Sequence, residues 1–200
     1  MNTHTAYPAP PLWLITLLYY VVWIGTVQLA ARGLPAEGAA LHLTFGVSLI
    51  LLSEAGRRPQ LWFRASLGSL VGYAFDSSLA LIGLISFPEQ SALLGPSPVW
   101  MTSLWFTFAV LLNGSLQWLL ASPMLAVSLG LIGGPMSYLG GAQSGAMLTH
   151  GPTWRTALVI GLSWGGLMGL SAWLWHPQAE GTPTPQSDEE QATPERSEPH

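Results

Sequence analysis

We predict an all-α fold for this sequence: a polytopic transmembrane helix bundle of about six spans, followed by a disordered acidic C-terminal tail. Only 8% of the 200 residues are charged, against roughly 25% in an ordinary soluble domain, and half of them are hydrophobic. Residues 90–154 contain no Asp, Glu, Lys or Arg. A charge-free stretch of this length indicates a membrane protein.

The first three spans are cut at charged residues and at prolines. A bilayer core about 30 Å thick needs roughly 20 apolar residues in a helix. The first span is predicted at 11–31. The second, at 39–54, is the weakest, because it is short and contains His42. The third, at 61–87, stops at Pro88.

Prolines and glycines mark the last three spans. The fourth is predicted at 99–121, between Pro98 and Pro123. The fifth, at 124–146, is rich in glycine, and the sixth, at 156–175, follows Arg155.

Tryptophans support these boundaries, because their amphipathic rings favour the headgroup layer. Trp23 and Trp164 do not fit, since both fall inside spans. The tryptophans near predicted span ends are Trp13, Trp62, Trp100, Trp118, Trp154, Trp173 and Trp175.

Three regions follow from this pattern: a short N-terminal tail at 1–10, a helical domain at 11–176 and an acidic tail at 177–200. The tail is rich in Pro, Ser, Thr and Glu, and it lacks the apolar groups that would offset its ordering entropy. We expect it to be disordered, with a cytosolic protein as a candidate partner.

The arginines predict an orientation. Arg57, Arg58 and Arg64 lie together between the second and third spans, whereas Arg32 and Arg155 are isolated. The positive-inside rule places the three-arginine connection in the cytoplasm. With six spans, both termini then lie in the cytoplasm.

Several function classes are excluded or unsupported. The chain has no Lys and a net charge of −4, so nucleic acid is not an expected partner. It has no Cys, and His42 and His150 each lack a second ligand at helical spacing, so we expect no metal and no cofactor. Common hydrolase, nucleotide-binding and metalloprotease motifs are absent. Whether the protein is an enzyme stays open.

Asp76 is the sharpest candidate for a functional residue. It lies about 15 to 18 Å from either end of the third predicted span, which is the bilayer midplane. Small residues share its helical stripe, so another helix could approach it closely. In one interpretation Asp76 is a general base, a proton carrier or a cation ligand. In the other it is a hydrogen-bonded residue of helix packing.

Asn113, near the middle of the fourth span, is the expected partner of Asp76. Gln117 follows one turn later on the same face. Amides inside membranes often hold helices together, so a contact between Asp76 and Asn113 is first a structural expectation.

The fifth and sixth spans carry stripes of small residues and are expected to pack tightly. Pro135 should kink the fifth span and free carbonyl groups beside Ser137 and Tyr138, which could line a pocket. Gly161, Gly165 and Gly169 form the stripe of the sixth span, which could also join two copies of the chain. Membrane lipids are the remaining expected partner.

The segments GYAFDSSLALIGLISFP, PVWMTSLWFTFAVLLNGSLQWL and LIGGPMSYLGGAQSGAM, in this order, resemble an uncharacterised family of small bacterial inner-membrane proteins known only as a domain of unknown function. The resemblance covers residues 12–175. It implies the inner membrane as location, no established activity, and an association with lipid modification such as cyclopropane fatty acid synthesis. It carries over Asp76, Asn113 and residues 134–138. Gly114 stands where that family usually has His.

Three functional hypotheses remain. The protein takes part in envelope lipid metabolism, as an accessory protein or an enzyme, with Asp76 and Tyr138 around a pocket for acyl chains. Alternatively it is a small proton-coupled transporter that uses Asp76 at the midplane. In the third hypothesis it is a structural or interaction protein whose polar groups only hold helices together.

Overall fold

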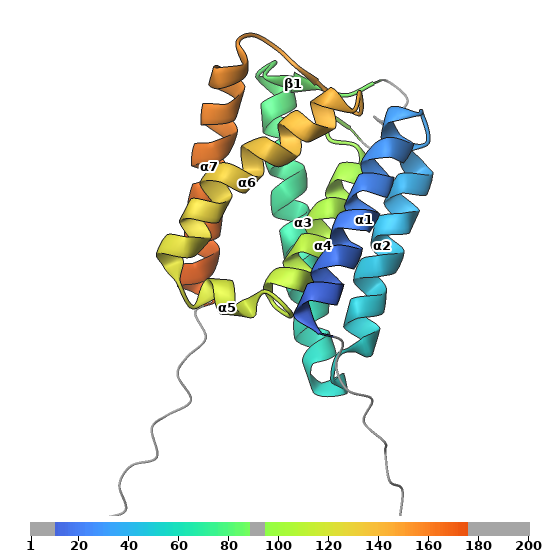
Figure 1. Ribbon diagram of the computed structural model, residues 1–200, viewed down its shortest axis with the longest axis vertical. Coiled ribbons are helices and arrows are strands. Elements are labelled where there is room, and N and C mark those ends of the chain that lie inside the picture. The colour runs from blue at the N-terminus through green and yellow to red at the C-terminus, as the bar shows by residue number, and fades with distance from the viewer. Residues whose placement is uncertain (1–10, 89–94, 176–200) are drawn as a thin grey trace, which may run out of the picture.

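Helices make up almost all of the chain that the structure describes, and they run alternately up and down one common direction (Figure 1). The computed structural model describes residues 11–88 and 95–175. The N-terminal tail at 1–10 and the acidic tail at 177–200 lie outside the described residues. The predicted all-α fold is confirmed.

The first half of the chain forms three long helices. These are α1 (Leu12–Ala31), α2 (Pro35–Leu52) and α3 (Arg58–Leu81), with a 3₁₀ turn η1 (Ala55–Arg57) before α3. Gly33, at φ +80°, makes the tight turn between α1 and α2.

The second half begins with α4 (Val99–Leu112) and the one-turn helix α5 (Gln117–Leu120). A hairpin of α6 (Pro123–Gln143) and α7 (Thr153–Leu174) completes the chain. Pro135 lies inside α6, which continues past it.

Two predicted spans end earlier than expected. The third was expected to reach Phe87, but α3 ends at Leu81, because Gly83 turns the chain at φ +70°. The fourth was expected to reach Ala121, but α4 stops after Leu112 and leaves only α5 beyond the turn. Hydropathy predicts an apolar stretch and does not register such turns within it.

The sequence did not predict the short antiparallel ladder of β1 (Ile85–Ser86) and β2 (Leu148–Thr149). Ile85 pairs with Thr149, and the His150 amide donates to the Leu84 carbonyl (2.9 Å). The ladder ties the α3–α4 connection to the α6–α7 connection at the upper end of the bundle (Figure 1).

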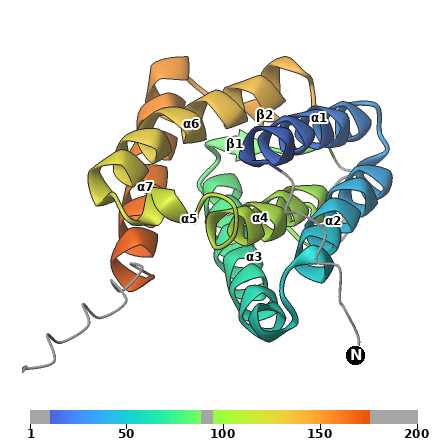
Figure 2. The ribbon, with the colours of Figure 1, turned by 60° about the horizontal axis from the view of Figure 1, so that its bottom comes forward.

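The helices form two groups. Helix α4 packs between α2 and α3, and α1 packs on α2, which gives a four-helix group. Helices α6 and α7 pack on each other to form the α6–α7 hairpin beside that group (Figure 2). The seam is the surface between the α6–α7 hairpin and helices α1, α3 and α4. Large side chains fill it.

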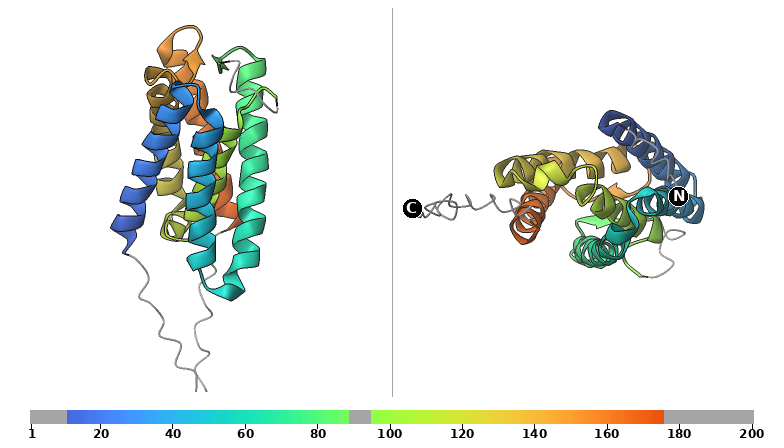
Figure 3. Two further views of the ribbon diagram at one scale, coloured as in Figure 1. Left: turned by 90° about the vertical axis from the view of Figure 1, so that its right-hand side faces the viewer. Right: turned by 90° about the horizontal axis from the view of Figure 1, so that it is seen from below.

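The outer surface is apolar, as in a protein surrounded by lipid. Helices α1, α2, α6 and α7 are long and apolar enough to cross a membrane. Helix α4 is apolar but has only 14 residues, ten of them buried, and α3 carries charge. The predicted number of six spans is therefore approximate, although six helices lie side by side (Figure 3).

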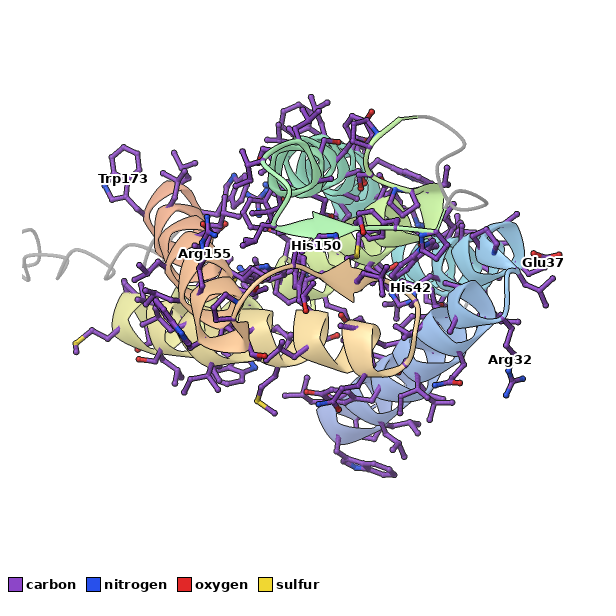
Figure 4. All side chains as sticks on the ribbon, turned by 90° about the horizontal axis from the view of Figure 1, so that it is seen from above. Arg32, Glu37, His42, His150, Arg155 and Trp173 are labelled. Carbon is purple, nitrogen blue, oxygen red and sulfur yellow. The ribbon has the colours of Figure 1, made fainter. Side chains whose placement is uncertain are left out.

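Polar groups gather at the two ends. Arg32 and Glu37 point away from the bundle at the end that carries the ladder, where His150 also lies (Figure 4). Arg57 and Arg58 lie at the opposite end, at the start of α3.

Trp173 projects outward from α7 and is 76% exposed (Figure 4). Trp100 differs, because it is 1% exposed and belongs to the core rather than to an interfacial belt.

Candidate functional site

Asp76 is fully buried and holds three helices together. Trp105 of α4 donates its indole N–H to Asp76 Oδ2 (2.8 Å), and Tyr138 of α6 donates its hydroxyl to Asp76 Oδ1. Each carboxyl oxygen thus has a donor from a different helix. The sequence predicted Asp76 at the middle of its span. In the structure it lies five residues before the end of α3, about 7.5 Å, so this prediction is wrong.

Glycine at position 72 makes room for Trp105. A Cβ atom on Gly72 would lie 2.0 Å from Cγ of the Trp105 ring, and one on Gly68 would lie 2.6 Å from the Ala109 Cβ. Gly72 is one turn before Asp76 on α3, so the indole lies across the helix and reaches the carboxylate. The expected close approach of another helix to this stripe is confirmed, and that helix is α4.

Aromatic rings surround the carboxylate. Trp105 stacks on Trp164 of α7, with ring centroids 4.5 Å apart and planes 21° apart. Phe75 meets the edges of Trp105 (5.9 Å) and Tyr138 (6.4 Å), and Phe108 meets Trp164 (5.4 Å). These rings form the contact between the α6–α7 hairpin and the four-helix group.

Close packing of α6 on α7 places Trp164. A Cβ on Gly130 would lie 2.6 Å from the Trp164 carbonyl oxygen, and one on Gly134 would lie 2.5 Å from its ring. The expected packing between these helices is confirmed.

The glycine stripe of α7 faces α6 of the same chain. A Cβ on Gly161 would lie 2.8 Å from the Leu131 carbonyl oxygen, and Gly165 and Gly169 also abut α6 side chains. Two copies of the chain could therefore associate through this stripe only if α6 moved away.

A small central cavity of about 50 Å³ lies beside Tyr138. Trp23 of α1, Trp100 of α4 and Trp164 of α7 contribute to its wall. Among the described residues the indole nitrogens of Trp100 and Trp164 are buried and have no hydrogen-bond partner. The cavity has room for roughly one or two water molecules, which could accept from these donors.

Two larger grooves lie along the seam. The α3–α7 groove, about 300 Å³, is bounded by α3, α4 and α7 and contains Val71 and Leu170. The α1–α6 groove, about 380 Å³, is bounded by α1, α4, α5, α6 and α7 and contains Ser137. Trp164 and Phe108 stand between them and belong to both walls.

The predicted contact between Asp76 and Asn113 is wrong. Asn113 follows the last residue of α4, and its Oδ1 accepts from Arg64 Nη1 (2.6 Å). Arg57 Nη2 donates to the Asn113 carbonyl oxygen (3.2 Å) and to Gln117 Oε1 (3.2 Å). The chain turns after Leu112, so the side chains of Asn113 and Gln117 lie beside arginines at the N-terminal end of α3. Asp76 lies near the C-terminal end of the same helix.

The two histidines form local hydrogen bonds. His42 Nδ1 lies 3.1 Å from Thr26 Oγ1, which joins α1 to α2, and His150 Nε2 lies 2.8 Å from Ser86 Oγ beside the ladder. Within residues 11–88 and 95–175, no group of three or more His, Cys, Asp and Glu side chains could hold a metal ion.

The sequence interpretation brought Asp76 and Tyr138 around one site, and the structure joins them directly. It missed Trp105, the second donor to Asp76. A signal was present, since Trp23, Trp105 and Trp164 all lie inside spans rather than at their ends, and all three line the central cavity. A tryptophan in the middle of a membrane span needs a partner for its indole N–H.

Comparison with known proteins gives a family without an assigned activity. No curated protein and no solved structure matches the chain. A family model described as a protein of unknown function (DUF2878) matches residues 11–170, which include α1 to α6 and most of α7. The chain therefore belongs to the DUF2878 family, whose function is unknown.

Proposed function

We propose that this protein binds a membrane lipid by placing one acyl chain in the α3–α7 groove. It does so as a multi-pass protein of the bacterial inner membrane that takes part in envelope lipid metabolism, as an accessory protein or an enzyme. The groove is the observation that supports the proposal most strongly.

The groove has the composition and length of an acyl-chain site. Its wall is mainly Leu, Val, Phe, Met and Trp, and its rim residues Val71, Leu170 and Leu174 are 39%, 50% and 53% exposed. Along α7 it extends from Trp164 to Trp175, about 16 Å. That is close to half of a bilayer core about 30 Å thick, which is the depth of one leaflet.

The two ends of the groove differ. Trp105 and Trp164 close it near the middle of the bundle, whereas Arg64 and Asn113 lie at the other end, with Trp175 beside them. A lipid placed with its chain end against the stacked rings would have its headgroup at the arginine end.

The arginines also give the orientation that we propose. The end with Arg57, Arg58 and Arg64 faces the cytoplasm by the positive-inside rule. The described chain starts and finishes at this same end (Figure 1), so both termini would be cytoplasmic. The lipid would then come from the cytoplasmic leaflet.

In this proposal Asp76 is a positioning residue. Its carboxylate fixes the Trp105 indole, and Trp105 with its stacked partner Trp164 forms the closed end of the groove. Proton-coupled transport through Asp76 is the alternative. It would require this enclosed carboxylate to become accessible, because the groove reaches Trp105 but Asp76 is not in its wall.

A lipid profile of cells tests the proposal. We would compare cells that lack the protein with cells complemented by the wild type, by Val71→Trp or by Val21→Trp, under normal growth and under oxidative stress. Both substitutions replace valine by tryptophan. Val71 lies in the groove, whereas Val21 is 59% exposed on α1 and outside the groove wall.

The wild type and Val21→Trp are expected to restore the same lipid species, and Val71→Trp is expected to fail because the indole fills the groove. Identical profiles in all strains would contradict a role in lipid metabolism.

A further inference from the structure

Resting on this proposed function, we infer that the arginine end of the α3–α7 groove is a headgroup site that selects an anionic phospholipid. Arg64 and Arg57 are the charged groups of this site, and Asn113 and Gln117 are its positioning residues.

Arg64 is a half-buried cation in the wall of an apolar groove. Within the described residues its one hydrogen bond goes from Nη1 to Asn113 Oδ1 (2.6 Å), and its guanidinium carbon lies 5.5 Å from the Trp175 ring centroid. A guanidinium has five N–H donors in a planar fork that matches a phosphate. Nε and Nη2 of Arg64 are therefore available to a ligand.

Arg57 adds a second cation beside the same amide. It uses Nη2 for the Asn113 carbonyl oxygen and for Gln117 Oε1, each at 3.2 Å. Asn113 thus joins the two arginines, through its side chain to Arg64 and through its backbone to Arg57.

The partners of both guanidinium groups are neutral. Neither Arg57 nor Arg64 forms an ion pair with a carboxylate in the described part of the chain. A cation at the boundary of an apolar groove is stabilised by an opposite charge, because burial removes part of its hydration. A phosphate diester at the end of an acyl chain would supply such an opposite charge.

Net charge favours an anionic headgroup over a zwitterionic one. Arg57, Arg58 and Arg64 lie at this end of the bundle, and Glu54 is the acidic residue described near them. The ammonium group of a zwitterionic lipid would face this surplus of positive charge, whereas a glycerol headgroup would not.

The position of Arg64 within the groove links the charged headgroup site to the site for the acyl chain. Arg64 belongs to the same groove as Val71 and Trp105, which follow it along α3 and α4 toward the closed end. A free phosphate would use the arginines alone. A phospholipid would use both the arginines and the apolar wall, which is why we assign the site to a lipid.

The test measures headgroup preference on the full chain purified in detergent. Native mass spectrometry would count bound lipid after addition of equimolar phosphatidylglycerol and phosphatidylcholine with identical acyl chains, so that the chains contribute equally. Variants are Arg64→Gln and Arg64→Lys, with Arg32→Gln as the control, because Arg32 is exposed at the opposite end. The elution profile on size exclusion verifies folding.

The wild type and Arg32→Gln are expected to prefer phosphatidylglycerol by about tenfold, because both lipids offer the same phosphate but the ammonium group of phosphatidylcholine faces the surplus of positive charge. Arg64→Gln should bring the ratio below about threefold, and Arg64→Lys should retain an intermediate preference because the charge remains. Inorganic phosphate at the same concentration should not displace the lipid.

Equal binding of the two lipids by the wild type would overturn the headgroup site and leave the acyl-chain proposal intact. Displacement by inorganic phosphate would show a site for a free anion and would also overturn it. Failure to bind either lipid would contradict the proposed function itself. A preference that Arg64→Gln leaves unchanged would also overturn the site, and Arg64→Lys carries this comparison if Arg64→Gln fails to fold.

Discussion

Asp76 acts as a buried acceptor for two donors that come from other helices. Removing the carboxylate leaves the Trp105 N–H and the Tyr138 hydroxyl without an acceptor, and each unsatisfied buried donor costs about 1–3 kcal/mol. The residue therefore stabilises the contact between the four-helix group and the α6–α7 hairpin, and its loss should be felt as a loss of stability.

Asp76→Ala is expected to lower the free energy of unfolding in detergent by at least about 2 kcal/mol. Asp76→Asn should cost less, because its Oδ1 still accepts one bond. Ser128→Ala is the control, since that hydroxyl is exposed and bonds only to Met124 of its own helix; it should change stability by less than about 0.5 kcal/mol. Thermal unfolding followed by circular dichroism ranks the variants by stability. An Asp76→Ala protein as stable as the Ser128→Ala control would refute the structural role of Asp76.

Gly72 is the residue on which the Trp105 position depends. Gly72→Ala places a methyl group 2.0 Å from the indole, so the ring must leave Asp76, and we expect a loss of about 1–3 kcal/mol from overpacking alone. Gly166→Ala is the matched control, because nothing lies within 4 Å of a Cβ there and alanine favours the helix. Equal stability of the two variants would contradict the packing of α4 on α3.

At this scale the sequence predicted Asp76 and Tyr138 as members of one site but assigned Asn113 to the wrong neighbour. Trp105 lies on α4 and Asn113 directly follows its last residue, and only the register of α4 against α3 decides which of them faces Asp76. That register depends on Gly68 and Gly72 fitting Ala109 and Trp105, which is a packing property that residue spacing within one helix does not contain.

Among the elements, the β1–β2 ladder links the two helix groups at the upper end of the bundle. It pairs Ser86 of the α3–α4 connection with Leu148 of the α6–α7 connection. Facing residues of an antiparallel pair lie within the range that a disulfide can bridge.

Because the chain has no cysteine, a Ser86→Cys and Leu148→Cys pair can be tested without background. Oxidation should join the two cysteines in most molecules, seen as a mobility shift that a reductant reverses. A Ser86→Cys and Leu158→Cys pair, with the second cysteine exposed on α7, should give no such shift. Equal cross-linking of both pairs would argue against the ladder.

The elements themselves were largely predictable. All six predicted spans correspond to helices, because roughly 20 apolar residues between prolines, glycines and charges form a helix in lipid. The short strands were not predictable, since two residues carry no periodicity. The early ends of α3 and α4 were missed because Ile85 and Leu119 are as apolar after the turn as inside a helix.

For the whole molecule, the arginines predict that the start of α3 and both described chain ends face the cytoplasm. Single cysteines at Ala36, Ala55 and Thr153 can report this, since all three residues are exposed. A membrane-impermeant thiol reagent added to intact cells should label Ala36→Cys and Thr153→Cys, and Ala55→Cys only after permeabilisation. The reverse pattern would invert the topology, and with it the leaflet from which the lipid comes.

The charge-poor composition predicted a membrane protein, but only the folded chain shows where its surface is concave. The α3–α7 groove is made by residues from three helices, and Trp105 and Trp164 close it because they stack across the seam. No segment of the sequence contains more than one wall of the groove.

If the α3–α7 groove holds an acyl chain, the purified protein retains a bound lipid there. Native mass spectrometry of the wild type, Val71→Trp and Val21→Trp in detergent with one added phospholipid would give the number of lipids retained. The wild type and Val21→Trp are expected to retain one lipid, and Val71→Trp is expected to retain none. Retention of the same lipid by all three proteins would place the lipid outside the α3–α7 groove.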